Sequence, residues 1–127
     1  MMLMIPNIPD EADWTPSAEA VAAMGRYNEE LTKAGALLAL DGLHPGSKGA
    51  RVSFAGGRPS VTDGPFAEAK EMIGGYWLIQ ARSKDEAVEW ACRCPAAEGD
   101  VIEVRQVFEL TDFPPDVQEA AGFTPTS

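Results

Sequence analysis

The single histidine of the chain, His44, lies in a short segment that also contains a carboxylate. The segment reads Asp41-Gly42-Leu43-His44-Pro45 and follows an apolar run, at the place where a strand should end and a loop begin. Loops in such places often carry functional side chains, and histidine exchanges protons most readily near neutral pH. A histidine oriented by Asp41 or Asp63, and within hydrogen-bond reach of a substrate, would serve as a general acid or base. The alternative is a solvated or structural histidine.

A second candidate segment, Asp63-Gly64-Pro65-Phe66-Ala67-Glu68-Ala69-Lys70-Glu71, is the most distinctive in the chain. Asp63 can accept hydrogen bonds from the backbone of a turn, Gly64 permits an unusual φ angle, and Pro65 fixes the next φ. Phe66 can anchor this turn in the core. These residues predict a turn that leads into a short helix. The alternative is that Asp63 is a carboxylate held at the rim of a pocket.

Two helices are expected to position these segments. The first begins with Thr15 as its N-cap and Pro16 as its first helical residue, and Gly35 ends it. Its apolar residues recur mostly at steps of three and four, which predicts one buried face. They are Ala20, Val21, Met24, Tyr27, Leu31 and Ala34.

The second helix is expected to start at Ser83, with Glu86 at the spacing of a capping box, and to end at Pro95. Its apolar stripe consists of Ala87, Trp90, Ala91 and Cys94. Cys92 and Cys94 are too few for a disulfide framework or a structural zinc site, so we expect reduced thiols. With one histidine as well, no metal site is expected.

Five segments are predicted as strands: 1–5, 36–40, 51–54, 75–81 and 101–108. The order of strand, helix, three strands, helix and strand is a βαββαβ unit with one additional strand. We assign the segment 51–54 to an inserted hairpin that turns at Gly56-Gly57. The pattern predicts an α+β fold, a ferredoxin-like split βαβ sandwich.

The strand 75–81 is apolar on both faces, through Tyr76, Trp77, Leu78 and Ile79. A sheet with such a strand needs cover on the side that its helices leave open, and a second copy of the chain would supply it. From Thr111 onward the composition changes to Pro, Gly, Thr and acidic residues. We therefore expect a domain over 1–110 and a tail over 111–127 that could contact a neighbouring subunit through Phe113 and Phe123.

Composition excludes several functional classes. The chain has 127 residues, 45% hydrophobic and 24% charged, which fits one globular domain. Its net charge of −10 disfavours nucleic acid and anionic membranes as partners. The apolar start is too short for a membrane span or a secretion signal, so we expect a cytoplasmic protein. The glycine pairs lack the spacing of phosphate-binding loops, and no cofactor is expected.

The residues of the second candidate segment carry a resemblance to a known family. The run Val61-Thr62-Asp63-Gly64-Pro65-Phe66-Ala67-Glu68-Ala69-Lys70-Glu71, followed by Gly74-Gly75-Tyr76-Trp77-Leu78-Ile79, closely resembles the signature of the YCII-related, or DGPF-domain, family. The later Cys94-Pro95-Ala96-Ala97 and Val101-Ile102-Glu103-Val104-Arg105 are similar to the usual ending of that family. The likeness covers most of residues 20–108.

This resemblance implies a ferredoxin-like fold and a homodimer of the dimeric α+β barrel type. It implies no defined reaction. The family is suspected of enzymatic activity because a histidine and an aspartate approach each other in a pocket, and some relatives are associated with sigma factors of the extracytoplasmic-function class. On matching positions, the resemblance points to Asp41, His44 and Asp63 as catalytic candidates and to Glu68 and Lys70 as weaker substrate-binding candidates.

The chain departs from the family pattern at its start. Pro6 and Pro9 follow the first strand, which limits its length and alters one wall of any pocket. Two hypotheses remain open. In the first, the protein is a small-molecule enzyme, suited to isomerisation or elimination, with His44 as acid or base in a mostly apolar pocket that the dimer encloses. In the second, it is a regulatory module that senses a metabolite in the same pocket or docks a protein partner at the sheet edge.

Overall fold

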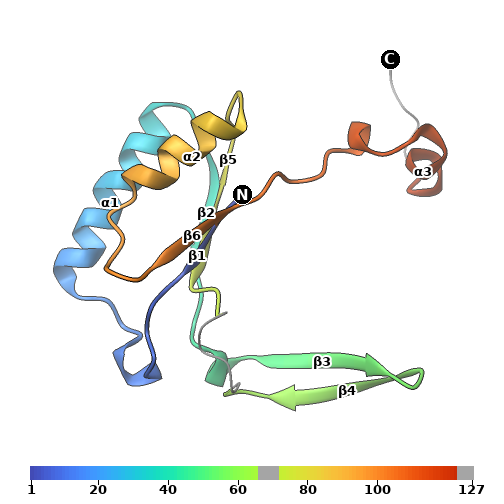
Figure 1. Ribbon diagram of the computed structural model, residues 1–127, viewed down its shortest axis with the longest axis horizontal. Coiled ribbons are helices and arrows are strands. Elements are labelled where there is room, and N and C mark those ends of the chain that lie inside the picture. Colours follow the sequence, from blue (N-terminus) through green and yellow to red (C-terminus); the bar gives the residue numbers. More distant parts are fainter. Residues whose placement is uncertain (66–71, 123–127) are drawn as a thin grey trace.

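The computed structural model describes residues 1–65 and 72–122 (Figure 1). Its strands are β1 (Met2–Ile5), β2 (Leu37–Gly42), β3 (Ala50–Ala55), β4 (Arg58–Asp63), β5 (Gly75–Ile79) and β6 (Val101–Val104). Its α-helices are α1 (Ala18–Lys33), α2 (Lys84–Arg93) and α3 (Pro115–Ala120). Short 3-10 helices lie at Glu11–Asp13, Gly46–Lys48 and Leu110–Asp112. None of the helices in the described ranges is both long enough and apolar enough to cross a membrane.

Four strands form one antiparallel sheet in the order β2-β5-β1-β6, and β3 and β4 form a separate hairpin. The helices α1 and α2 lie together on one side of the four-stranded sheet (Figure 1). This arrangement confirms the predicted α+β, ferredoxin-like fold with an extra hairpin. The last strand is shorter than predicted, because β6 ends at Val104 and the chain then leaves the sheet.

The two long helices begin at serine caps. Ser17, not Thr15, is the N-cap of α1, and its Oγ accepts a hydrogen bond from the backbone N–H of Ala20. The predicted start was therefore two residues early, because the Thr-Pro pair resembles a cap but the serine that follows supplies the bond. In α2 the predicted cap is confirmed, since Ser83 Oγ accepts from the N–H of Glu86.

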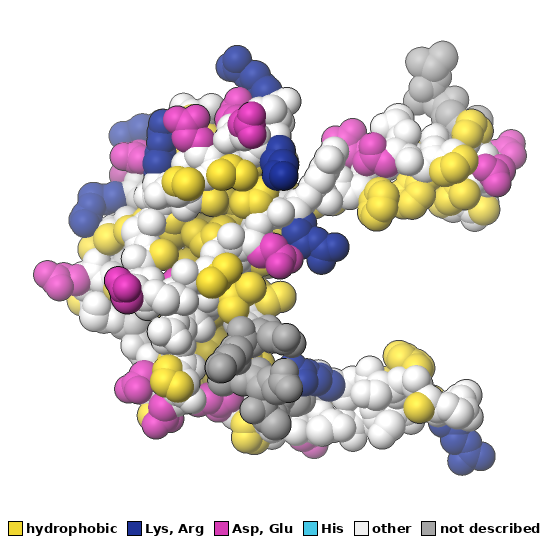
Figure 2. Space-filling view, viewed as in Figure 1, with side chains coloured by type: hydrophobic (Ala, Val, Ile, Leu, Met, Phe, Trp, Pro, Cys, Tyr) yellow, Lys and Arg dark blue, Asp and Glu magenta, His cyan; other side chains and the backbone are white. Residues whose placement is uncertain are grey.

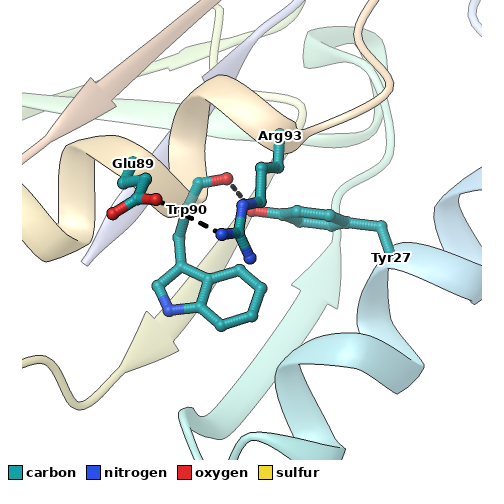
Figure 3. A network of polar contacts seen from close by, with 4 residues as sticks. All are labelled: Tyr27, Glu89, Trp90 and Arg93. Carbon is teal, nitrogen blue, oxygen red and sulfur yellow. Dashed lines mark hydrogen bonds and ion pairs between the residues drawn. The ribbon is translucent and has the colours of Figure 1, made fainter.

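The core lies between α1, α2 and the sheet. Met2 and Leu31 have no exposed surface, and Tyr27, Ala36 and Trp77 complete the buried cluster. The rings of Tyr27 and Trp77 meet edge to face, with centroids 5.9 Å apart, a favourable geometry for aromatic pairs. Because a buried hydroxyl needs a partner, Tyr27 donates from Oη to the backbone oxygen of Trp90 over 2.6 Å (Figure 3).

Burial also acts on the ionisable groups of this core. It raises the pKa of the Tyr27 hydroxyl well above its ordinary value. Burial, with a smaller contribution from Asp100, raises the pKa of the Cys94 thiol to about 11. Cys94 packs against the core as its helical phase predicts, whereas Cys92 is exposed. The two groups stay protonated at neutral pH and act as packing residues.

The hairpin formed by β3 and β4 is amphipathic and projects from the sheet (Figure 1). Val52 lies opposite Val61, and Phe54 lies opposite Pro59. Because side chains alternate between the two faces of a strand, these four residues share one face, which we call the hairpin stripe. Phe54 is 81% exposed and Val61 is 67% exposed. All four residues of the hairpin stripe are exposed in the single chain.

A second arm leaves the sheet after β6 and carries α3 (Figure 1). Phe108 and Phe113 stack on it with ring centroids 4.8 Å apart, and Phe108 is 73% exposed. Seen from the side of Figure 2, the molecule is hollowed between this arm and the hairpin, and hydrophobic side chains lie on both arms beside the hollow. The predicted tail forms part of this arm as far as the structure describes it, to residue 122, and Phe123 lies outside the described residues.

Candidate functional site

A cavity of about 480 Å³ lies where β1 and β2 end and β5 begins. Most of its lining is apolar, which is usual for small-molecule sites. The apolar side chains are Met4, Pro6, Ile8, Trp14, Pro16, Met24, Leu40, Leu43 and Trp77. The polar residues of the lining are Asn28, Asp41, His44 and Tyr76. Asp41 and Tyr76 lie opposite each other on the face of the sheet that points away from Trp77 and the helices. The structure therefore brings two of the predicted catalytic residues, Asp41 and His44, to the same cavity.

Asp41 is positioned by pairing between strands. It lies opposite Tyr76 in the register of β2 and β5, and its Oδ2 accepts a hydrogen bond from the Tyr76 hydroxyl over 2.7 Å. That hydrogen bond, together with the negative charge of Asp41, raises the pKa of Tyr76. Tyr76 therefore stays a donor at neutral pH and fixes the orientation of the carboxylate. Between Asp41 and His44 the structure shows no hydrogen bond within the described ranges.

His44 follows β2 in a loop whose backbone is held on both sides. The N–H of Leu43 donates to the backbone oxygen of Gly74 over 2.9 Å, and the indole Nε1 of Trp14 donates to the oxygen of Leu43, also over 2.9 Å. The imidazole is exposed and has no hydrogen-bond partner among residues 1–65 and 72–122. A proton-exchanging side chain on an anchored loop is thus free to contact a ligand in the cavity.

The segment between β1 and α1 forms the outer wall of the cavity. Pro6, Ile8, Trp14 and Pro16 all line it, as expected from the unusual start of the chain. A hydrogen bond holds this wall in place, since Glu11 Oε1 accepts from the backbone N–H of Ser47 over 3.1 Å. Sequence reasoning did not identify Trp14 as a site residue, because a tryptophan between prolines gives no periodic signal.

Asn28 is a further lining residue that sequence reasoning missed. The indole Nε1 of Trp77 donates to its Oδ1 over 2.9 Å. Asn28 is four residues after Met24 and three before Leu31, so it lies on the apolar stripe of α1. A polar residue on a buried stripe is the signal that could have revealed it.

Asp63 is not among the lining residues of this cavity. It is the exposed last residue of β4, opposite Ala50, and its catalytic role stays a prediction. Gly64 does not have the predicted unusual φ. A glycine is needed there because a Cβ would overlap the backbone oxygen of Gly46. Glu68, Lys70 and the predicted short helix lie outside the described residues.

A second cavity, of about 610 Å³, lies at the opposite end of β2 and β5 beside α2. Its charged side chains neutralise one another. Arg93 pairs with Glu89 at 3.3 Å and lies 4.9 Å from the centre of the Trp90 ring (Figure 3). Arg82 and Glu86 approach to 3.9 Å. None of the predicted site residues that the structure describes lines this cavity, so the first cavity is the candidate site.

Within residues 1–65 and 72–122, no three His, Cys, Asp or Glu side chains gather closely enough to hold a metal ion. The groups that the cavity itself offers are the imidazole of His44 and the amide of Asn28, and the Asp41–Tyr76 pair lies beside it on the open face of the sheet. These groups can bind an uncharged ligand and exchange protons with it.

Comparison with known proteins identifies a relative of the chain and a matching family. It is 41% identical over 68 residues to an uncharacterised protein of Rhizobium meliloti (strain 1021), and this match covers 54% of the chain and 55% of that protein. The chain thus matches only about half the length of this relative. The profile of the YCII-related domain matches residues 1–111, which confirms the resemblance read from the sequence. The chain belongs to the family of proteins with a YCII-related domain.

Proposed function

We propose that the protein binds a small molecule in the 480 Å³ cavity and acts on it as an enzyme with His44 as general acid or base. The observation that carries the proposal is that His44 and Asp41 line one mostly apolar cavity. A proton donor or acceptor beside an enclosed ligand is the minimum that isomerisation or elimination requires. A regulatory role in sensing a metabolite is the second hypothesis, and it would use the same cavity.

The groups of the cavity support different steps of such a reaction. The imidazole of His44 can take a proton from a ligand or return it. The carboxylate of Asp41, oriented by Tyr76, acts on the positive charge that the imidazole gains through space, without a hydrogen bond to it within the described ranges. The apolar walls of the cavity supply the surface that a ligand buries on binding.

The test uses a ligand found by a thermal-shift screen of uncharged small molecules, followed by an assay for its conversion. Replacing His44 by glutamine is expected to lower turnover by about 10²–10⁴-fold. Ligand affinity and the melting temperature should change little, because the imidazole has no partner within the described ranges. Lys48→Gln, in the same loop region but outside the cavity lining, is the matched control and should keep full activity.

Equal turnover in the wild-type protein and in His44→Gln would remove His44 from the mechanism. A ligand that binds in the cavity but is never converted would instead favour the sensor.

We also propose that two copies of the chain associate through the open face of the sheet and the two arms. Leu3 and Tyr76 lie opposite each other in the sheet, and they face away from the helices because Met2 and Trp77, their neighbours, are buried on the helical side. Hydrophobic side chains of the hairpin border the hollow between the two arms (Figure 2). An isolated two-stranded hairpin is only marginally stable in water, so its apolar face is expected to pack against a second copy.

A further inference from the structure

The amide group of Asn28 has a fixed orientation in the wall of the cavity. An indole nitrogen can only donate, so the bond from Trp77 Nε1 requires the amide oxygen to face Trp77. The nitrogen, Nδ2, then points away from Trp77 and has no hydrogen-bond partner within residues 1–65 and 72–122. In those ranges, no buried polar side-chain atom lacks a partner. Nδ2 is therefore accessible, and because Asn28 lines the cavity, it is a donor available to a ligand there.

The charge around this donor disfavours anions. Asp41 is one of the lining residues, and the lining residues that the structure describes include no lysine or arginine. The whole chain carries a net charge of −10, which adds to the repulsion. A ligand that carries a carboxylate or phosphate would have to enter this field without a cation to pair with, which is costly in an apolar site.

On the basis of the proposed ligand-binding role of this cavity, we propose that it selects an uncharged, largely apolar molecule whose carbonyl oxygen accepts a hydrogen bond from Asn28 Nδ2. Trp77 supports this preference, because its hydrogen bond holds the Asn28 amide in the orientation that presents Nδ2 to the cavity. Asn28 is thus a specificity residue, and the carbonyl is the polar group by which the ligand is oriented between His44 and the wall of α1.

Three probes of similar size test this inference: acetophenone, ethylbenzene, which lacks the carbonyl oxygen, and benzoate, which carries a charge. Their dissociation constants are measured from the broadening of the NMR signals of each probe. We expect benzoate to bind roughly tenfold or more weakly than acetophenone, since like charges in an interface cost considerable free energy.

The decisive variant is Asn28→Asp, which keeps an oxygen for Trp77 but replaces the NH₂ donor by an acceptor. The affinity for acetophenone relative to ethylbenzene should fall by about fivefold or more, the size of one net hydrogen bond. Gln106→Glu introduces the same charge at an exposed residue outside the cavity lining and should leave the ratio unchanged. Circular dichroism and the melting temperature verify that each variant is folded.

The possible results separate this inference from the proposal on which it rests. If Asn28→Asp keeps the wild-type ratio of the affinities for acetophenone and ethylbenzene, or if Gln106→Glu lowers this ratio equally, Asn28 does not donate a hydrogen bond to the carbonyl oxygen. If benzoate binds as tightly as acetophenone, the selection against anions is wrong. If none of the probes binds the wild-type protein at millimolar concentration, the proposed ligand site itself fails, and this inference fails with it.

Discussion

Replacing Leu31 by alanine is expected to lower the free energy of unfolding by about 3–5 kcal/mol, the cost of truncating a fully buried leucine. Leu31 has no exposed surface and packs against Met2, Tyr27 and Trp77 in the centre of the core. The loss combines buried apolar area with a cavity that the rigid aromatic neighbours cannot fill. Urea denaturation at a fixed protein concentration measures it.

The matched control for this prediction lies on the same helix. Val21 is 56% exposed, so Val21→Ala should change the free energy of unfolding by no more than about 0.5 kcal/mol. A loss below about 1 kcal/mol in Leu31→Ala would contradict the packing of α1 on the sheet, since a site that can be truncated so cheaply is not a close-packed core.

Replacing Val61 by aspartate is expected to dissociate the proposed dimer. Val61 belongs to the hairpin stripe, opposite Val52, and an unpaired carboxylate there would be buried against the second copy. We expect the dimer dissociation constant to rise by about 100-fold or more, which is about 2.7 kcal/mol. Sedimentation velocity at micromolar concentration should show the wild-type protein at twice the 13.6 kDa mass of one chain and the variant near that mass.

Ser60→Asp provides the control, because Ser60 is adjacent in β4 but faces the opposite, polar side of the hairpin. It should leave the dimer intact. A wild-type protein that sediments as a folded single chain would refute the association, and equal effects of the two aspartates would show that the hairpin stripe is not the contacting face.

The sequence predicted the elements well because each has a strong local signal. The three-and-four spacing identified α1, the serine cap identified α2, and the run from Tyr76 to Ile79 identified β5 as a strand apolar on both faces. The end of β6 could not be predicted in this way. The end of β6 is set by its pairing with β1. Val104 lies opposite Met2, and after the hydrogen bond from Arg105 N–H to the backbone oxygen of Met1 the chain leaves the sheet.

The candidate site was predicted only in part, because a site joins residues that are distant in the sequence. Asp41 and His44 are three residues apart and were recognised together. Asn28 and Trp14 reach the same cavity through hydrogen bonds to Trp77 and to the backbone of Leu43. Neither bond can be read from spacing. Gly75 is a similar case: a Cβ there would come within 2.9 Å of the backbone oxygen of Asp41, a contact known only once the strands are paired.

The most direct measurement of the proposed site is an NMR titration of the labelled protein with a ligand from the thermal-shift screen. The chain has three tryptophans and one histidine, so few side-chain signals need assignment. Trp14, Trp77 and His44 line the proposed site, whereas Trp90 lines the other cavity. The account predicts that the indole signals of Trp14 and Trp77 and the imidazole signals of His44 shift together, while the indole of Trp90 stays in place. A ligand that shifts Trp90 and leaves His44 and Trp14 unchanged would contradict it.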